Sequence, residues 1–122
     1  MKHFCLTDWV TIRGMTSLIA TITQGEPEWI DMGEHEDAVF YLQVQNVTGT
    51  VTLTYQTSPS MDDVSFQPLF PGFVMVTGTR APDRVLAKYS LVPVARYVRW
   101  QLVGGNGASP YDATFQIWVG AF

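Results

Sequence analysis

Apolar and polar residues alternate along most of this chain, and glycine, proline, asparagine and aspartate interrupt the alternation at short intervals. In residues 38–47, for example, Phe40, Leu42 and Val44 fall on one face, whereas Tyr41 and Gln43 fall on the other. A period of two residues is typical of a β-strand with one buried face. No segment has a convincing run of apolar residues at helical spacing, so the pattern predicts a chain built of strands.

About eight strands are expected. The clearest patterns cover residues 38–47, 50–57, 96–103 and 113–119, and weaker ones cover 18–23, 28–32, 73–77 and 85–92. Thr48 and Gly49 separate the first two segments, which we expect to form an antiparallel hairpin. Eight strands in a chain of this length predict an all-β fold, an antiparallel two-sheet sandwich or jelly roll in which each sheet covers the apolar face of the other.

The domain organisation follows from length and pattern. A chain of 122 residues is long enough for one hydrophobic core. We expect a single β-sandwich domain over residues 18–122. Residues 1–17 are left open as an N-terminal arm, a first strand, or a short helical turn capped by Thr7 or Asp8.

The charge content is low and its sign is negative. Charged residues make up 15% of the chain, against about 25% in a typical globular domain, and the net charge is −4. Threonine, serine, glutamine and asparagine must therefore cover much of the surface, or part of it is buried against a partner. Seven scattered basic residues do not favour binding to nucleic acid or to an anionic membrane.

Cys5 is the single cysteine, which excludes an internal disulfide and a multi-cysteine metal site, and we expect it to be a small buried residue. Asp8 and Arg13 interrupt any apolar run that could serve as a signal peptide. No stretch approaches the roughly 20 apolar residues needed to span a bilayer. We therefore expect assembly in the cytoplasm.

The candidates for chemistry are few. His3 lies near the N-terminus, and His35 lies in the acidic segment 33–37, where neighbouring donors seldom converge on one ion. Asp62 and Asp63 supply too few oxygens for calcium and are more typical of a turn. We expect no catalytic residues, no metal, no cofactor and no enzymatic activity.

Four tryptophans, five tyrosines and seven phenylalanines are many for this length. Most must fill the core, but Trp118 alternates with Ile117 and Val119 and should point outward. The loop from Pro68 to Phe73 either covers the end of the sandwich or contacts a neighbour. The candidate contact residues are Leu69, Phe70, Phe73, Tyr97, Tyr111 and Trp118. Outward aromatic residues are typical of protein interfaces and of sugar-stacking sites, although scattered exposed ones are also normal.

Two segments resemble a known family. Residues 40–58, followed by Asp62, Asp63 and Phe66, are similar to the middle strand pair of discoidin-like (galactose-binding-like) jelly rolls. Residues 95–100 and the strand at 115–119 look like the closing strands of the same fold. The resemblance covers about half the chain, lacks the family's usual cysteine pair, and implies the fold but no binding site.

The chain is also similar in style to small β-sandwich virion proteins of tailed phages, such as capsid decoration proteins. We therefore expect a non-catalytic structural or assembly protein, such as a tailed-phage virion accessory or capsid decoration subunit. It would act through protein–protein contacts, as a homo-oligomer or within a larger particle. The alternative is a carbohydrate-binding module that uses Trp118, Tyr97 or Tyr111.

Overall fold

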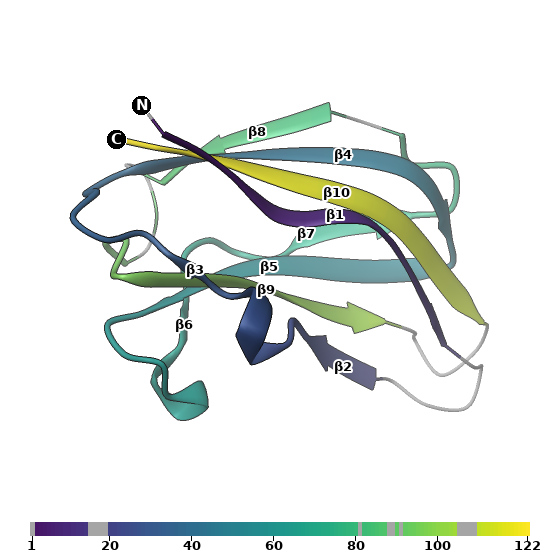
Figure 1. Ribbon diagram of the computed structural model, residues 1–122. Helices are drawn as coiled ribbons and strands as arrows, with labels where there is room; N and C mark the ends of the chain where they lie inside the picture. Colours follow the sequence, from purple (N-terminus) through teal and green to yellow (C-terminus); the bar gives the residue numbers. More distant parts are fainter. Residues whose placement is uncertain (1, 15–19, 81, 88–89, 91, 105–109) are drawn as a thin grey trace.

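The computed structural model describes residues 2–14, 20–80, 82–87, 90, 92–104 and 110–122. Two antiparallel β-sheets pack face to face, one of four strands and one of six (Figure 1). The described residues contain two short 3-10 helices and no α-helix. The predicted all-β, two-sheet sandwich is confirmed.

The four-stranded sheet has the order β1-β10-β4-β8. Its strands are β1 (Lys2–Gly14), β10 (Tyr111–Ala121), β4 (Ala38–Thr48) and β8 (Pro82–Leu86). The six-stranded sheet has the order β2-β9-β5-β6, with β3 also paired to β9 and β7 also paired to β5. Its strands are β2 (Ala20–Thr23), β9 (Tyr97–Gly104), β5 (Thr50–Ser58), β6 (Gln67–Pro68), β3 (Ile30–Asp31) and β7 (Phe73–Val76).

The core lies between the sheets and follows the alternation of the sequence. Successive side chains of a strand point to opposite faces, so every second residue of β4, β5, β9 and β10 enters the interior. The largest fully buried side chains include Phe40, Phe115, Leu42, Leu53, Leu102 and Ile117. Each such side chain contributes about 1.5–3 kcal/mol when it leaves water, which makes this layer the main source of stability.

The prediction that residues 38–47 and 50–57 form an antiparallel hairpin was wrong. β4 pairs with β10 and β8, whereas β5 pairs with β9, β6 and β7, so the two strands lie in different sheets. Gly49 takes φ +80° between them, and a Cβ there would lie 2.7 Å from the carbonyl oxygen of Pro110. The chain therefore turns a corner from one sheet to the other, and two alternating segments joined by a glycine do not reveal this.

The N-terminal residues, for which the sequence left three structures open, form the edge strand β1. It runs antiparallel to β10 from Lys2, opposite Ala121, to Gly14, opposite Tyr111, with irregular register between Cys5 and Val10. Such irregularities bend an edge strand and oppose pairing with another chain along its length. Residues 15–17 of the predicted arm lie outside the described residues.

The weaker patterns give shorter strands than expected. Instead of a strand over 28–32, the chain forms the 3-10 helix η1 (Glu26–Glu28), with a proline in its first turn, followed by the two-residue strand β3. The pattern over 85–92 corresponds to β8, which ends at Leu86. Residues 18–19 of one expected strand, and 88–89 and 91 of another, lie outside the described residues.

Candidate contact surfaces

The outer side of the six-stranded sheet carries an uncharged face made of threonine and valine. Val51 and Leu53 of β5 point into the core, so Thr50, Thr52 and Thr54 point outward. Their cross-strand partners on β7 and β9 point the same way. We call the following nine residues the threonine–valine face: Thr21, Thr23, Thr50, Thr52, Thr54, Val74, Val76, Gln101 and Val103.

Two side chains of the threonine–valine face are strongly exposed. Val74 is 58% and Val76 is 52% accessible to solvent, and Thr52 and Thr50 lie directly opposite them on β5. None of the nine residues is charged, although the chain carries eleven acidic and seven basic residues. The face therefore has enough apolar surface to be buried against another protein. It also carries no charged group that would repel a negatively charged surface.

A cluster around Arg99 covers the other half of this sheet's outer side. Arg99 is only 4% exposed, and its guanidinium carbon lies 3.9 Å from the ring centroid of Phe66 and 5.0 Å from that of Trp29. Its Nε donates to Gln56 Oε1 at 2.8 Å, and its Nη1 donates to Asp63 Oδ1 at 2.5 Å. The cluster holds η1 and the second 3-10 helix, η2 (Asp63–Ser65), against the sheet, on the side away from the four-stranded sheet (Figure 1).

Arg99 is buried although it lies on the outer face of its sheet. Alternation along β9 correctly places its side chain on the face opposite Trp100. The alternation could not reveal that the segments around Trp29 and Phe66 fold over that face. Asp62 acts as predicted for a turn residue, since its carboxylate accepts from the Val64 backbone N–H at the start of η2.

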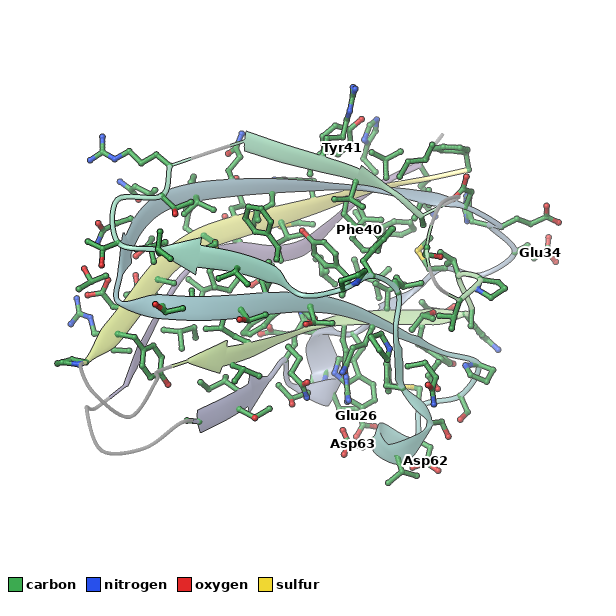
Figure 2. The ribbon with its side chains drawn as sticks, turned by 180° about the vertical axis from the view of Figure 1, so that it is seen from behind. Glu26, Glu34, Phe40, Tyr41, Asp62 and Asp63 are labelled. Carbon is green, nitrogen blue, oxygen red and sulfur yellow. The ribbon has the colours of Figure 1, made fainter. Side chains whose placement is uncertain are left out.

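The outer side of the four-stranded sheet carries a different surface, with an exposed aromatic pair. Trp118 of β10 lies directly opposite Tyr41 of β4, and they are 41% and 38% exposed. Figure 2 shows Tyr41 pointing away from the sandwich while its neighbour Phe40 points between the sheets. Cys5 on β1 and Arg84 on β8 complete the same row across the sheet.

Polar groups lie on one side of the aromatic pair and a hollow on the other. In the adjacent row Gln116 lies opposite Gln43, and the Gln116 amide donates to Asp8 Oδ1 at 2.8 Å. On the other side is an open hollow of about 430 Å³. It is lined by Val39, Tyr41, Arg84 and Leu86.

The six predicted contact residues have different positions in the structure. Trp118 is exposed, and Phe70, Phe73 and Tyr97 are half-buried. Leu69 is fully buried, and its backbone N–H donates to Tyr55 O, so the 68–73 loop runs along β5 between β6 and β7 and closes the core there. Tyr111 is also buried. The expectation that Leu69 and Tyr111 offer contact surface was therefore wrong.

The buried position of Tyr111 depends on two glycines. A Cβ placed on Gly14 or on Gly104 would come within 2.1 Å of the Tyr111 ring. The ring thus lies against both backbones and joins β1, at the end of one sheet, to β9 in the other. The alternation of Ala113, Phe115 and Ile117, extended back to Tyr111, indicates an inward side chain, so the sequence carried a signal that Tyr111 is buried.

The residues that sequence reasoning did not single out are Val74 and Val76. Both lie in a segment, Phe73–Val76, in which every residue is apolar. An all-apolar strand gives no indication of which side is buried, so only the pairing with β5 shows that Phe73 and Met75 face inward.

The two histidines do not assemble a reactive site. The His35 ring lies edge-on to Phe4, and its Nδ1 is 2.7 Å from Met32 O. His3 is exposed on β1. Within the described part of the chain, no three His, Cys, Asp or Glu side chains gather where they could hold a metal ion. Similarly, none of the described helices is long and apolar enough to cross a membrane.

A larger open hollow, of about 550 Å³, lies beside the loop that precedes β4. Glu36, Asp37 and Ser90 are its polar lining residues. Asp37 Oδ1 accepts from the Ala38 backbone N–H, and the Ser90 hydroxyl donates to Val92 O. Asp37 and Ser90 therefore serve local backbone hydrogen bonds and do not form a nucleophile–base pair.

Three surface groups, Cys5, Asp31 and Arg96, have shifted pKa values. Partial burial, and secondarily the charge of Asp8, raise the pKa of the Cys5 thiol, which is exposed on β1 rather than buried as expected. The hydrogen bond from Arg96 is the main cause that lowers the pKa of Asp31, and a hydrogen bond from the Gly33 backbone adds to it. Arg96 forms two bonds to Asp31, at 3.1 and 3.0 Å, and they tie β3 to the start of β9.

Comparison with solved structures places the fold among known sandwiches. The chain superimposes on part of a chain from T=1 particles derived from infectious bursal virus, with a TM-score of 0.56 and 15% identity, covering 97% of this chain and 30% of that one. A chain from infectious bursal disease virus strain Gx gives a TM-score of 0.54 and 13% identity, with 97% and 32% covered. This chain thus spans about a third of the length of the two viral chains.

A third similar structure is a chain from the disulfide-linked pili of Bacillus endospore appendages. Its TM-score is 0.46 and its identity 18%, and 97% of this chain and 89% of that chain are covered. No protein-family model matches the sequence, and no curated protein does. The comparisons therefore establish a small jelly-roll-like β-sandwich and assign no family.

Proposed function

We propose that this protein is a non-catalytic structural subunit that assembles with other copies of itself. The finer form of the proposal is a virion accessory or capsid decoration subunit that is assembled in the cytoplasm and acts through protein–protein contacts. The observation that carries the proposal is the threonine–valine face, which is uncharged in a chain with a net charge of −4.

Electrostatics favours this face for contact between identical chains. Two copies of a negatively charged protein repel each other, and burying an unpaired charge between them would add a large desolvation cost. The threonine–valine face avoids the desolvation cost and brings no like charges into contact. Interface centres are depleted in charged residues for the same reason.

The shape and chemistry of the face also support association. The outer faces of two sheets can pack about 10 Å apart with their side chains interdigitated, as in a β-sandwich. Val74 and Val76 would leave water on contact, at about 25 cal/mol for each Å² of apolar surface buried. The threonine hydroxyls can exchange hydrogen bonds across the contact without introducing charge.

The structural comparisons are consistent with this proposal. The two viral chains that share the fold come from a virus, one of them from T=1 particles, and the fold is thus found in a protein of an assembled shell. The likeness concerns the fold, so the proposal depends on the threonine–valine face rather than on the comparison.

Size-exclusion chromatography with light scattering, over a wide range of protein concentration, tests self-association. The unaltered protein should form a defined oligomer, and the double variant V74K/V76K should be monomeric. Val64→Lys is the matched control, because Val64 is 82% exposed on η2 and lies outside the face. A monomeric unaltered protein, or a double variant that assembles as well as the control, would contradict the proposal.

The virion assignment needs a separate test. The chain should sediment with intact virus particles in a density gradient and be identified there by mass spectrometry. Its absence from every particle fraction would remove this part of the proposal and leave self-association to be judged by light scattering.

A further inference from the structure

We propose that the exposed face of the four-stranded sheet, opposite the threonine–valine face, is a carbohydrate-binding site that takes a neutral oligosaccharide. Its platform is the cross-strand pair of Trp118 and Tyr41. This site is independent of the proposed self-association, because it uses the other sheet.

The first argument is the geometry of the aromatic pair. Residues directly opposite in an antiparallel pair have Cβ atoms about 4.5–5.5 Å apart, so the Trp118 and Tyr41 side chains rise from the sheet next to each other. Both remain well exposed although neighbouring side chains could have covered them. Two adjacent aromatic side chains can contact the C–H faces of one sugar ring or of two consecutive rings.

The second argument is the polar surroundings. A sugar ring has an apolar face and a rim of hydroxyl groups, so its site needs hydrogen-bonding groups beside the aromatic rings. Gln43 and Gln116 form the next row, and each amide offers both donors and an acceptor. The Gln116 Nε2 donates to Asp8 Oδ1 at 2.8 Å, which leaves the Gln116 amide oxygen available to accept from a sugar hydroxyl.

The third argument is the hollow on the other side of the rings. It has a volume of about 430 Å³, within the range of roughly 300–1,000 Å³ that small-molecule sites occupy. Val39 and Leu86 give it an apolar wall and Arg84 gives it a cationic group. Tyr41 lines the hollow directly, so a ligand stacked on its ring could extend into it.

Other classes of ligand fit this surface less well. The apolar part is one row deep and lies next to Asp8, Gln43, Gln116 and Arg84, whereas the centre of a protein interface excludes such polar groups. The carboxylate of Asp8 and the net charge of −4 disfavour a polyanion such as nucleic acid. A neutral sugar can form hydrogen bonds with these polar groups and carries no charge that Asp8 would repel.

The test is titration of the protein with soluble cello-, xylo-, manno- and chito-oligosaccharides, followed by tryptophan fluorescence and calorimetry. At least one series should bind, and Trp118→Ala and Tyr41→Ala should each weaken binding by about tenfold or more. Trp9→Ala is the matched control, because Trp9 is a similarly exposed tryptophan of β1 that lines a different hollow beside Glu28. The control should bind as the unaltered protein does.

Two results would overturn the proposal. One is the absence of binding to every series at millimolar concentration. The other is binding that the Trp118 and Tyr41 variants retain, or that the Trp9 control loses equally. Light scattering of the same variants separates the two proposals, because loss of sugar binding should leave the oligomeric state unchanged.

Discussion

The guanidinium carbon of Arg99 lies 3.9 Å from the centroid of the Phe66 ring, and the Phe66 and Trp29 rings are themselves 4.7 Å apart. A buried cation that packs against two contacting aromatic rings, with hydrogen bonds to Gln56 and Asp63, connects the outer side of β9 to both 3-10 helices. Local sequence patterns show none of these contacts. The contacts can be tested directly by mutation of Arg99.

Arg99→Ala should destabilise the fold by about 2–4 kcal/mol. The change removes the cation–π contact and leaves the buried Gln56 oxygen without its donor. The stability of Arg99→Lys should lie between that of Arg99→Ala and that of the unaltered protein, since lysine keeps the charge but loses the planar stacking. Urea unfolding followed by circular dichroism measures all three free energies.

The partner Asp63 provides the control for this prediction. Its side chain is 73% exposed, so solvent screens the ion pair, and Asp63→Asn should cost no more than about 1 kcal/mol. If Asp63→Asn destabilises as much as Arg99→Ala, the ion pair rather than the aromatic stack holds the cluster together.

Gly104→Ala should lower stability by about 1–3 kcal/mol, because the new methyl group would meet the Tyr111 ring and overpack the core. Gly25→Ala is the matched control, since a Cβ there would have only Pro27 nearby, at 3.9 Å. Thermal unfolding compares the two. A Gly104 variant as stable as the Gly25 variant would mean that Tyr111 does not pack against this strand.

The thiol of Cys5 should react slowly at neutral pH despite its exposure. Its pKa is raised, mainly by partial burial and secondarily by Asp8, so the midpoint of thiolate formation should lie above the ordinary pKa of 9.0. The pH dependence of the reaction with a thiol reagent gives the midpoint directly. Asp8→Asn should move the midpoint down, and a midpoint below 9.0 in the unaltered protein would contradict the assignment.

The Arg96–Asp31 pair should loosen in acid. The pKa of Asp31 is lower in the folded than in the unfolded chain, so its contribution to stability is present above the ordinary value of 3.8 and is lost as the pH falls through the folded value. An NMR titration of the Asp31 carboxyl carbon measures the folded value. Arg96→Gln should raise it toward 3.8, and an unchanged titration would show that Arg96 does not cause the shift.

The candidate surfaces were only partly predictable. Alternation correctly placed Trp118 and Tyr41 on the outside, because a side chain's face is set by its position in its own strand. Alternation did not apply to Leu69, which lies in a loop, but extended back along β10 it would have placed Tyr111 inward. It gave no sign of Val74 and Val76, whose strand is apolar throughout.

The sequence by itself determined that the chain is an all-β sandwich, and it located the main strands β4, β5, β9 and β10 and the residues that enter the core. These features depend on a period of two residues, which is a local property. Only the tertiary structure decided that β4 and β5 lie in different sheets, that Arg99 is covered, and that Tyr111 packs on Gly14 and Gly104. Each of these depends on which distant segments meet, and burial of apolar surface is non-directional, so alternation alone does not select the partner.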